Sequence, residues 1–384
     1  MNKVLIIVTS ASKRESFVKK TYNEQEIGLA KALSKKGWSC GIAYYGGGLE
    51  KYELVDIGGC QVNMYLFKGH DFLKTAFFKD YSSIYDQYDI LLPITYDHYE
   101  SYRIAMRYPQ KTIVYHGTYY AAFNKPYNLK CKIIDPLFLP GYRKMNTLFV
   151  TKNRLAAEFL NNKGLRNTHV IGVGFDAEQM ASQQMLYSDL AKQLEAYKKD
   201  GYKILLYVGR IEKRRNTQFL LDTFAKVSKT INAKLVVIGN GQEKYKKECL
   251  EIINNRGIRK DVIYMEKIEQ KYLPQIYRFS DLFLLPTSYE IFGMVLLEAM
   301  YFGVPVITTL NGGSDILIKN EKSGFIIPEL DSDKWSKKCI DILSKDYTSL
   351  TILAHKTIAE DFVWDALADK FLETFKLKVN EEKD

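Results

Sequence analysis

The hydrophobic pattern of this chain consists of short apolar runs separated by longer amphipathic segments. In the first half these runs predict several strands, and residues 24–36, which follow the first of them, predict a helix. The strands predicted there are residues 3–8, 90–94, 112–116, 147–150 and 169–173. A second series starts afresh and comprises residues 203–208, 234–238, 262–264, 282–285 and 304–308. Strands that alternate with helices are typical of parallel sheets covered by helices.

A polar, helix-prone segment at residues 176–200 separates the two series of strands. The chain has 384 residues, which is more than one hydrophobic core usually supports. We therefore predict an α/β protein with two Rossmann-like domains, residues 1–176 and residues 185–362. Ligands of such domains usually bind outside the carboxyl ends of the strands, so we expect a cleft between the two sheets.

The positive charge is concentrated in the first half of the chain. Residues 1–176 hold 24 Lys and Arg against 15 Asp and Glu, whereas the rest holds 31 against 30. This excess favours an anionic partner of the first domain, such as a membrane surface, a phosphorylated acceptor or a nucleic acid. A basic surface that only keeps the protein soluble explains the excess equally well.

Cysteine spacing and hydropathy exclude two other classes of protein. The five cysteines have no C-x-x-C spacing, so neither a zinc site nor a disulfide framework is indicated, and a reducing cytoplasm is the expected compartment. No stretch approaches the ~18 apolar residues that a spanning helix needs. We therefore expect a protein of the cytoplasm that does not cross a membrane.

The segment from residue 286 to residue 300 carries the most information about chemistry. A predicted strand ends just before it, and a helix is predicted to begin near Gly293, so that backbone N–H groups are available for a phosphate. Glu290 and Glu298 lie eight positions apart, which is roughly 12 Å if most of the span is helical. Carboxylates at that separation suit the hydroxyls of a sugar and of a ribose. Two solvated glutamates on a surface helix would produce the same spacing.

This segment resembles the E-x7-E region of retaining glycosyltransferases of family 4. The resemblance includes the Phe-Gly that follows Glu290 and the Leu-Glu-Ala-Met around Glu298. The G-x-P-V-I, Gly-Gly and S-G-F motifs of the family follow in order at residues 303–307, 311–313 and 323–325. The similarity is continuous from about residue 203 to residue 328, and it implies the GT-B fold.

The resemblance also implies roles for individual residues. Glu290 would act as a catalytic residue that faces the hydroxyls of the donor sugar, and Glu298 would bind the ribose. The main chain after Glu290 would hold the sugar and the phosphate, and the nucleobase would meet the main chain after the third strand of the second domain. The implied donor-binding residues are Gly209, Lys267, Ile268, Ile291, Phe292, Gly293, Met294, Val295 and Glu298.

A cluster of cations follows Gly209 at the end of a predicted strand. Such cations can neutralise a diphosphate, and arginine can do so with two hydrogen bonds, although a solvated loop would look the same in sequence. The related family has G-R-(L/I)-x-x-x-K here, and its Arg and Lys clamp the diphosphate. Arg210 matches the Arg, whereas Arg215 stands where the family has Lys, so that Lys213 or Arg214 could take that role instead. We count Arg210 and Arg215 among the catalytic residues.

The first half of the chain contains fewer such signals. His116 ends a predicted strand and could donate a hydrogen bond to the sugar or the phosphate, as a comparable histidine of the family does, although a lone histidine is more often structural. Residues 95–98 also end a strand and are candidates for the acceptor side. The Gly-Gly loop that many family members have after the first strand is missing, and residues 21–26 stand in its place. A helix at residues 364–378 is expected to pack back onto the first domain, as in the related family.

The triplet Asp331-Ser332-Asp333 has the D-x-D spacing of metal sites in a different glycosyltransferase fold. Helix capping explains it here, because the triplet lies directly before a predicted helix. We expect no catalytic metal and no cofactor.

The resemblance implies transfer of a sugar, with retention at the anomeric carbon, from a nucleoside-diphosphate sugar to a hydroxyl acceptor. A UDP-sugar is favoured as the donor. The expected acceptor is a lipid-linked saccharide of bacterial cell-surface polysaccharide synthesis, reached through peripheral contact of the basic first domain with the cytoplasmic face of the membrane. Residues 71–89 are a candidate for that contact, or else a core-facing helix. No motif supports binding of nucleic acid.

Two other functions stay open at this point. A non-catalytic GT-B subunit would bind the donor or only stabilise a partner enzyme. A sugar-nucleotide epimerase or hydrolase on the same fold would consume the donor without an acceptor.

Overall fold

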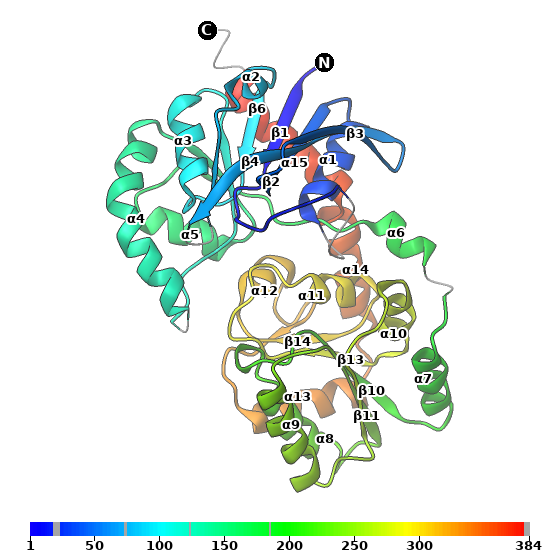
Figure 1. Cartoon of the computed structure of the whole chain (residues 1–384). Helices are drawn as coiled ribbons and strands as arrows, with labels where there is room; N and C mark the ends of the chain where they lie inside the picture. Colours follow the sequence, from blue (N-terminus) through cyan, green and yellow to red (C-terminus); the bar gives the residue numbers. More distant parts are fainter. Residues whose placement is uncertain (18–23, 73–74, 123, 184–185, 380–384) are drawn as a thin grey trace. The chain divides into compact units, whose positions relative to one another are not determined.

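The computed structural model describes residues 1–17, 24–72, 75–122, 124–183 and 186–379 (Figure 1). The chain forms two compact units, each of which is described by itself. The first unit comprises Met1–Phe175 and Phe362–Asp384, and the second comprises Asp176–Asp361. The predicted division at residues 176 and 185 left 177–184 between the domains, and the structure assigns this stretch to the second unit. The predicted segment 21–26 lies partly outside the described residues.

The first unit contains a mixed sheet with the strand order β3-β4-β2-β1-β6, in which β5 also pairs with β4. A separate parallel sheet, β7-β8-β9, continues it through single bridges between β6 and β7. The strands are β1 (Lys3–Ile7), β2 (Ser39–Gly47), β3 (Lys51–Ile57), β4 (Cys60–Phe72), β5 (Thr75–Phe78), β6 (Ile90–Pro93), β7 (Ile113–His116), β8 (Leu148–Thr151) and β9 (Thr168–Val170). The helices are α1 (Gln25–Lys35), α2 (Ser82–Tyr85), α3 (Tyr99–Arg107), α4 (Lys125–Lys144), α5 (Arg154–Asn162) and α15 (Trp364–Val379).

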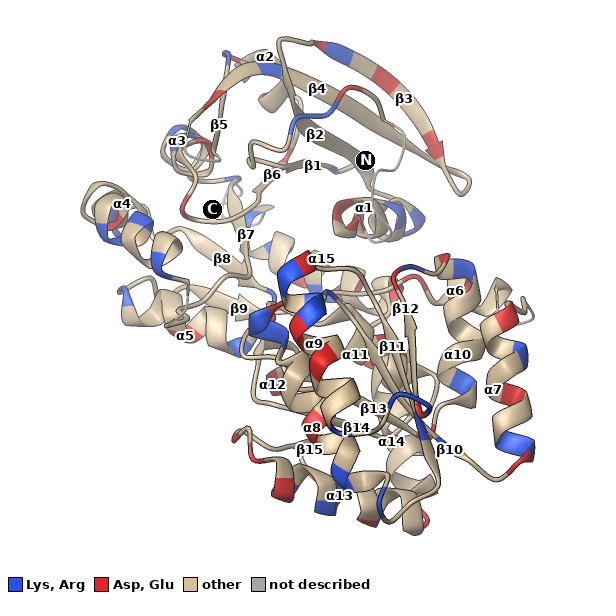
Figure 2. Cartoon of the chain, turned by 60° about the horizontal axis from the view of Figure 1, so that its bottom comes forward, with Lys and Arg blue, Asp and Glu red and all other residues tan. Residues whose placement is uncertain are grey.

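The antiparallel part of this sheet was not predicted. Residues 71–89 do not form one helix: they contain the end of β4, the strand β5 and the short helix α2. Strand β3 is exposed along most of its length, so it lacks the alternation of buried and exposed positions that makes a strand recognisable in sequence. The charges of this unit are also uneven, and Lys and Arg recur along α4 (Figure 2).

The second unit is built on a parallel sheet with the order β12-β11-β10-β13-β14-β15. Its strands are β10 (Lys203–Val208), β11 (Ala233–Ile238), β12 (Val262–Met265), β13 (Leu282–Leu285), β14 (Val306–Thr308) and β15 (Phe325–Ile326). Its α-helices are α6 (Ala177–Ser182), α7 (Asp189–Lys199), α8 (Thr217–Val227), α9 (Glu243–Asn255), α10 (Leu273–Phe279), α11 (Met294–Tyr301), α12 (Gly312–Leu317), α13 (Ser332–Ser344) and α14 (Thr348–Asp361). Short 3-10 turns lie at Lys213–Arg215 and Gln270–Tyr272. The order of strands is that of a Rossmann fold.

Helix α15 returns to the first unit and packs on α1, close to the predicted range of 364–378. The Trp364 ring fits where two glycines lack side chains: a Cβ on Gly28 would lie 2.1 Å from Trp364 Nε1, and a Cβ on Gly174 would lie 2.7 Å from Trp364 Cδ2. Farther along α15, the Phe375 ring lies 5.3 Å from that of Trp38. In the described part of the chain, no helix combines the length and the apolar character needed to span a bilayer.

We predict that Gly28→Ala destabilises the protein by about 1–3 kcal/mol through overpacking against the Trp364 ring. Alanine is the better helix former by up to about 1 kcal/mol, so the steric effect must exceed this gain. Gly48→Ala is the matched control, because nothing lies within 4 Å of a Cβ added there. The measurement is the free energy of unfolding in urea. Equal stability of the two variants would contradict this packing.

Candidate functional site

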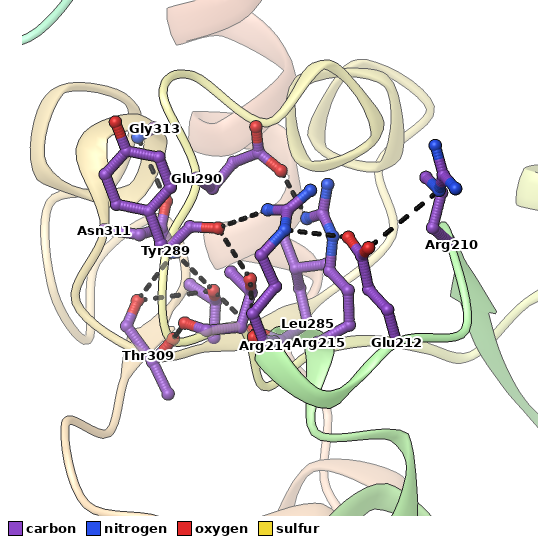
Figure 3. Close-up of polar contacts among 12 residues, drawn as sticks. Arg210, Glu212, Arg214, Arg215, Leu285, Tyr289, Glu290, Thr309, Asn311 and Gly313 are labelled. Atoms are coloured by element: carbon purple, nitrogen blue, oxygen red, sulfur yellow. Dashed lines mark hydrogen bonds and ion pairs between the residues drawn. The ribbon is translucent and has the colours of Figure 1, made fainter. Parts of the chain in front are cut away.

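The candidate site lies where the strand order of the second sheet reverses. Strands β10 and β13 are neighbours, and the order runs outward from them in opposite directions. Ligands of open α/β sheets bind at such a switch point, outside the carboxyl ends of the strands. Residues 209–216 (the β10 loop) and residues 286–293 (the β13 loop) follow these two strands. Both sequence motifs therefore reach the same edge of the sheet (Figure 3).

Asn216 and two main-chain groups join the β10 loop to the β13 loop. Asn216 has a left-handed backbone (φ 53°), which asparagine tolerates better than most residues. Its side-chain N–H donates to the Pro286 carbonyl at 2.7 Å and to Ser288 Oγ at 2.8 Å. The Ser288 N–H donates to the Arg214 carbonyl at 2.8 Å. The two loops therefore hold each other in place.

A third loop, which follows β14, supports the main chain around Glu290. The Gly312 N–H donates to the Glu290 carbonyl at 3.0 Å. Gly313 lies so close that an added Cβ would be 1.7 Å from the Phe292 carbonyl oxygen. Asn311 accepts hydrogen bonds from the N–H groups of Gly313 and Ser314 and so caps α12. The Asn-Gly-Gly motif thus holds the β13 loop against the start of α12.

The predicted cation Arg215 and the predicted carboxylate Glu290 form an ion pair between Nη1 and Oε2 (Figure 3). Their side chains are only 12% and 17% exposed, so the pair is poorly screened by solvent. The structure thus brings two of the predicted catalytic residues into direct contact. In this state each of them is neutralised by the other.

Arg210 and Arg214 differ sharply in how they are held. Arg214 Nε lies 2.7 Å from Glu212 Oε1, and its Nη1 donates to the Tyr289 carbonyl at 2.8 Å. Arg210 is 72% exposed, and its Nε is 4.0 Å from Glu212 Oε2. Arg214 is therefore a structural link between the two loops, whereas Arg210 has the freedom to turn toward an anion.

The N-terminus of α11 adds main-chain donors to this edge of the sheet. Gly293 precedes the helix with a left-handed backbone (φ 75°), which glycine adopts without strain. Among the hydrogen bonds of the described residues, none is donated by the N–H groups of Met294 and Val295. Ile291 is half-buried, and the Phe292 side chain is buried in the core, so only the main chain of Phe292 can meet a ligand. This arrangement suits an anion next to the arginines.

Glu298 lies away from solvent in the structure. Its side chain is completely buried, and Tyr277 of α10 donates a hydrogen bond to its Oε2 at 2.9 Å. Burial raises the pKa of the Glu298 carboxyl well above its usual range. Its Oε1 has no hydrogen-bond partner among the described residues. The ribose contact implied by the resemblance therefore stays a prediction, and it requires that this carboxyl become accessible.

The other predicted donor-binding residues lie along the same edge of the sheet. Gly209 ends β10, and an added Cβ on Gly239 would lie 1.9 Å from its carbonyl oxygen, so these two strand ends are in close contact. Lys267 and Ile268 follow β12, which is separated from β10 by β11. Lys267 is exposed and Ile268 is half-buried.

His116 belongs to the first unit, where it ends β7. Its ring is completely buried, its Nδ1 is 3.2 Å from Thr95 Oγ1, and its Nε2 has no hydrogen-bond partner in the described part of the chain. Burial lowers the pKa of His116 to about 4, so the imidazole is neutral at pH 7. Thr95 has a left-handed backbone (φ 71°), which is a strained conformation for a β-branched residue.

The predicted acceptor-side residues lie in the same polar cluster. The Asp97 carboxylate accepts from Thr95 Oγ1 at 2.6 Å and pairs with Lys130 Nζ at 2.7 Å. His98 Nδ1 lies 2.9 Å from Thr9 Oγ1, and burial lowers the pKa of His98 to about 4. These groups collect at the carboxyl ends of β1, β6 and β7, the edge at which ligands of such sheets bind.

Sequence reasoning missed several residues that shape the site. They are Glu212, Asn216 and Tyr277. Asn216 carried a signal, because an asparagine directly before a helix is a common left-handed or capping residue. Tyr277 carried none, because its contact with Glu298 joins two helices. The Asp331 side chain accepts from the N–H groups of Asp333 and Lys334, so the predicted helix cap is confirmed.

Comparisons with known proteins agree with the motifs of the second unit. Residues 191–359 match the family model described as glycosyl transferases group 1. An uncharacterized glycosyltransferase of Methanocaldococcus jannaschii, MJ1607, is 30% identical over 183 residues, which cover 46% of this chain and 46% of that protein. The chain thus spans about half the length of the curated relatives it matches.

Two solved structures are similar in fold to nearly the whole chain. Sucrose-phosphate synthase from Thermosynechococcus elongatus matches with a TM-score of 0.71 at 15% identity, over 99% of this chain and 100% of that one. Anabaena Alr3699/HepE in complex with UDP matches with a TM-score of 0.71 at 15% identity, over 97% of this chain and 99% of that one. The fold is of the GT-B type, as the resemblance implied.

The raised pKa of Glu298 predicts a specific pH dependence of stability. Above about pH 4.3 the unfolded chain loses the proton of Glu298, whereas the folded protein retains it. The free energy of unfolding therefore falls as the pH rises from about 4.3 toward the pKa of Glu298 in the folded protein. Glu298→Gln removes this loss. We therefore expect the variant to gain more than about 1 kcal/mol over the wild type between pH 4 and pH 7.

The measurement is urea unfolding at pH 4, 5, 6 and 7. The control is Glu251→Gln, which makes the same substitution at an exposed glutamate of α9. Parallel profiles for Glu298→Gln and the wild type would show that Glu298 is ionised in the folded state.

Proposed function

Because residues 191–359 match the family model described as glycosyl transferases group 1, we propose that the chain is a retaining glycosyltransferase. It moves a sugar from a nucleoside-diphosphate sugar, a UDP-sugar in our proposal, to a hydroxyl acceptor. The observation that carries the proposal is the ion pair of Arg215 with Glu290 at the switch point of the second sheet, with the exposed Arg210 on the same loop as Arg215. The complex of Anabaena Alr3699/HepE with UDP supports the choice of UDP as the first nucleotide to test.

The proposed diphosphate site combines main-chain donors with arginines. Arg210 is exposed and turns toward the phosphates, while the N–H groups of Met294 and Val295 at the start of α11 donate hydrogen bonds to them. Arg215 leaves Glu290 for the more highly charged diphosphate. Glu290 is then available to accept hydrogen bonds from hydroxyls of the donor sugar. One ion pair in the free protein is thus replaced by two contacts with the donor.

The proposed reaction takes place on one face of the sugar. The bond between the anomeric carbon and the phosphate oxygen breaks, and a bond to the acceptor oxygen forms on the same face. The acceptor proton moves to the leaving phosphate, so no enzyme nucleophile is needed. Arg210 and Arg215 stabilise the negative charge that develops on that phosphate. In this scheme His116, which is neutral at pH 7, hydrogen-bonds the sugar or a phosphate oxygen through its Nε2, and this requires that the buried ring become accessible.

The proposed acceptor is a lipid-linked saccharide of bacterial cell-surface polysaccharide synthesis. The support is the charge of the first half of the chain, with 24 Lys and Arg against 15 Asp and Glu in residues 1–176. A basic domain is attracted to the anionic lipids of a membrane surface and to a diphosphate-linked acceptor. We propose no metal and no cofactor for the reaction.

The first test is thermal and urea stability against UDP, GDP and ADP. A nucleotide at a hundredfold its dissociation constant stabilises the fold by about 2.7 kcal/mol. We expect this gain with UDP and its loss in Arg210→Ala, although without nucleotide that variant stays within about 0.5 kcal/mol of the wild type because the side chain is exposed. Arg256→Ala is the matched control, since Arg256 is 57% exposed and paired with Asp222 of α8 in the same unit.

The other outcomes decide between the alternatives. A gain with GDP or ADP alone would change the donor base, and no gain with any nucleotide would favour a non-catalytic subunit. If UDP binds, mass spectrometry measures the consumption of a UDP-sugar by the protein. The reaction is run with and without a membrane extract, which serves as the source of acceptor. Consumption that does not need the extract would identify a hydrolase or an epimerase.

A further inference from the structure

We propose that the exposed face of α4 docks on the surface of a membrane that contains anionic lipids. Every exposed residue of this 20-residue helix is either apolar or basic. These residues are Lys125, Pro126, Leu129, Lys132, Ile133, Pro136, Leu137, Pro140, Arg143 and Lys144. A helix on the surface of a soluble domain normally turns polar and charged residues of both signs toward water.

Three large aliphatic side chains lie in a row along this face. Leu129, Ile133 and Leu137 are spaced by four residues, so they lie on one side of the helix, and they are 60%, 61% and 65% exposed. The opposite side of α4 is fixed to the first unit: Phe138 and Tyr142 are buried, and the Phe138 ring stacks on Tyr102 with centroids 4.5 Å apart. The apolar row is therefore presented by a rigid support and has no use in the core.

The charges of α4 favour lipid headgroups as the partner of this row. Lys125, Lys132, Arg143 and Lys144 are exposed along the face, and Lys and Arg recur along the helix (Figure 2). The one acidic residue of the helix, Asp135, is half-buried and paired with Lys163. Apolar residues flanked by cations are the composition of helices that lie in the interface of anionic membranes.

Two prolines in the helix limit how deeply it can enter. Pro136 and Pro140 have no N–H group, so they cannot donate the helical hydrogen bonds to the carbonyls of Lys132 and Pro136. Carbonyls that lack such a donor are costly in hydrocarbon but can be hydrated among headgroups. The helix therefore lies in the headgroup region, with the three aliphatic side chains directed toward the acyl chains.

This inference rests on the proposed function and deepens it. It gives α4 the role of bringing the first unit to a lipid-linked acceptor. It replaces residues 71–89 as the candidate contact, since that stretch forms β5 and the short α2. Binding to vesicles needs neither donor nor acceptor. Vesicle binding can therefore be absent from a protein that UDP stabilises, and it can be present in a protein that UDP does not stabilise.

The test is co-sedimentation of the full chain with vesicles of phosphatidylcholine alone and of phosphatidylcholine with phosphatidylglycerol. We expect binding only with phosphatidylglycerol, weaker at higher salt, and reduced roughly tenfold or more by Ile133→Glu and by Lys132→Glu. Ile352→Glu is the matched control, because Ile352 is an isoleucine of α14 with 62% exposure, and it should bind as the wild type does. The free energy of unfolding in urea, measured on the same samples without nucleotide, checks that each variant is folded.

Three results would overturn the inference. They are the absence of wild-type binding to anionic vesicles, equal binding by Ile133→Glu, and an equal loss in Ile352→Glu. Light scattering separates a further possibility: a wild-type dimer that Ile133→Glu converts to a monomer would identify α4 as a contact between two copies of the chain instead.

Discussion

The ion pair between Arg215 and Glu290 is the interaction on which the proposed site of the second unit depends. It joins the loops that follow β10 and β13, the two strands at which the order of the sheet reverses. Removing one partner of a poorly exposed pair leaves an uncompensated charge and destabilises the fold far more than losing a surface pair would. In the free protein these two side chains therefore neutralise each other, and under the proposed function they separate for a donor that offers each of them another partner.

The precision of this edge comes from residues with special backbone properties. Asn216 and Gly293 adopt left-handed conformations at the points where each loop enters its helix. Gly313 allows the start of α12 to touch the main chain beside Glu290, where any side chain would collide. The resulting loops are fixed by short hydrogen bonds, which leaves Arg210 and Lys213 as the exposed cations of the β10 loop. Rigid loops with adjustable charges suit the capture of a diphosphate.

Local sequence patterns predicted β1, β6 to β9 and β10 to β14 to within a few residues, because buried parallel strands are continuous apolar runs, but they did not predict β2, β4 or β5. The same patterns predicted that the β10 and β13 loops lie at the carboxyl edge of the second sheet, because the end of a strand fixes where the following loop begins. They could not predict that Glu298 is buried against Tyr277, because this depends on how α10 and α11 pack. The exposed strand β3 and the outward apolar row of α4 were also missed. In both cases the burial differs from the usual pattern of the element, because β3 has no buried face and α4 exposes large apolar side chains.

The most direct test of this account is the affinity for UDP of Glu290→Gln, measured by titration calorimetry in the Arg215 and the Arg215→Met backgrounds. If the diphosphate must take Arg215 from Glu290, removing the carboxylate charge tightens UDP binding by about fivefold, a coupling of about 1 kcal/mol, when Arg215 is present. In the Arg215→Met background the same substitution should have little effect. An equal change in both backgrounds, or weaker binding in the first, would contradict the exchange of Arg215 between Glu290 and the donor.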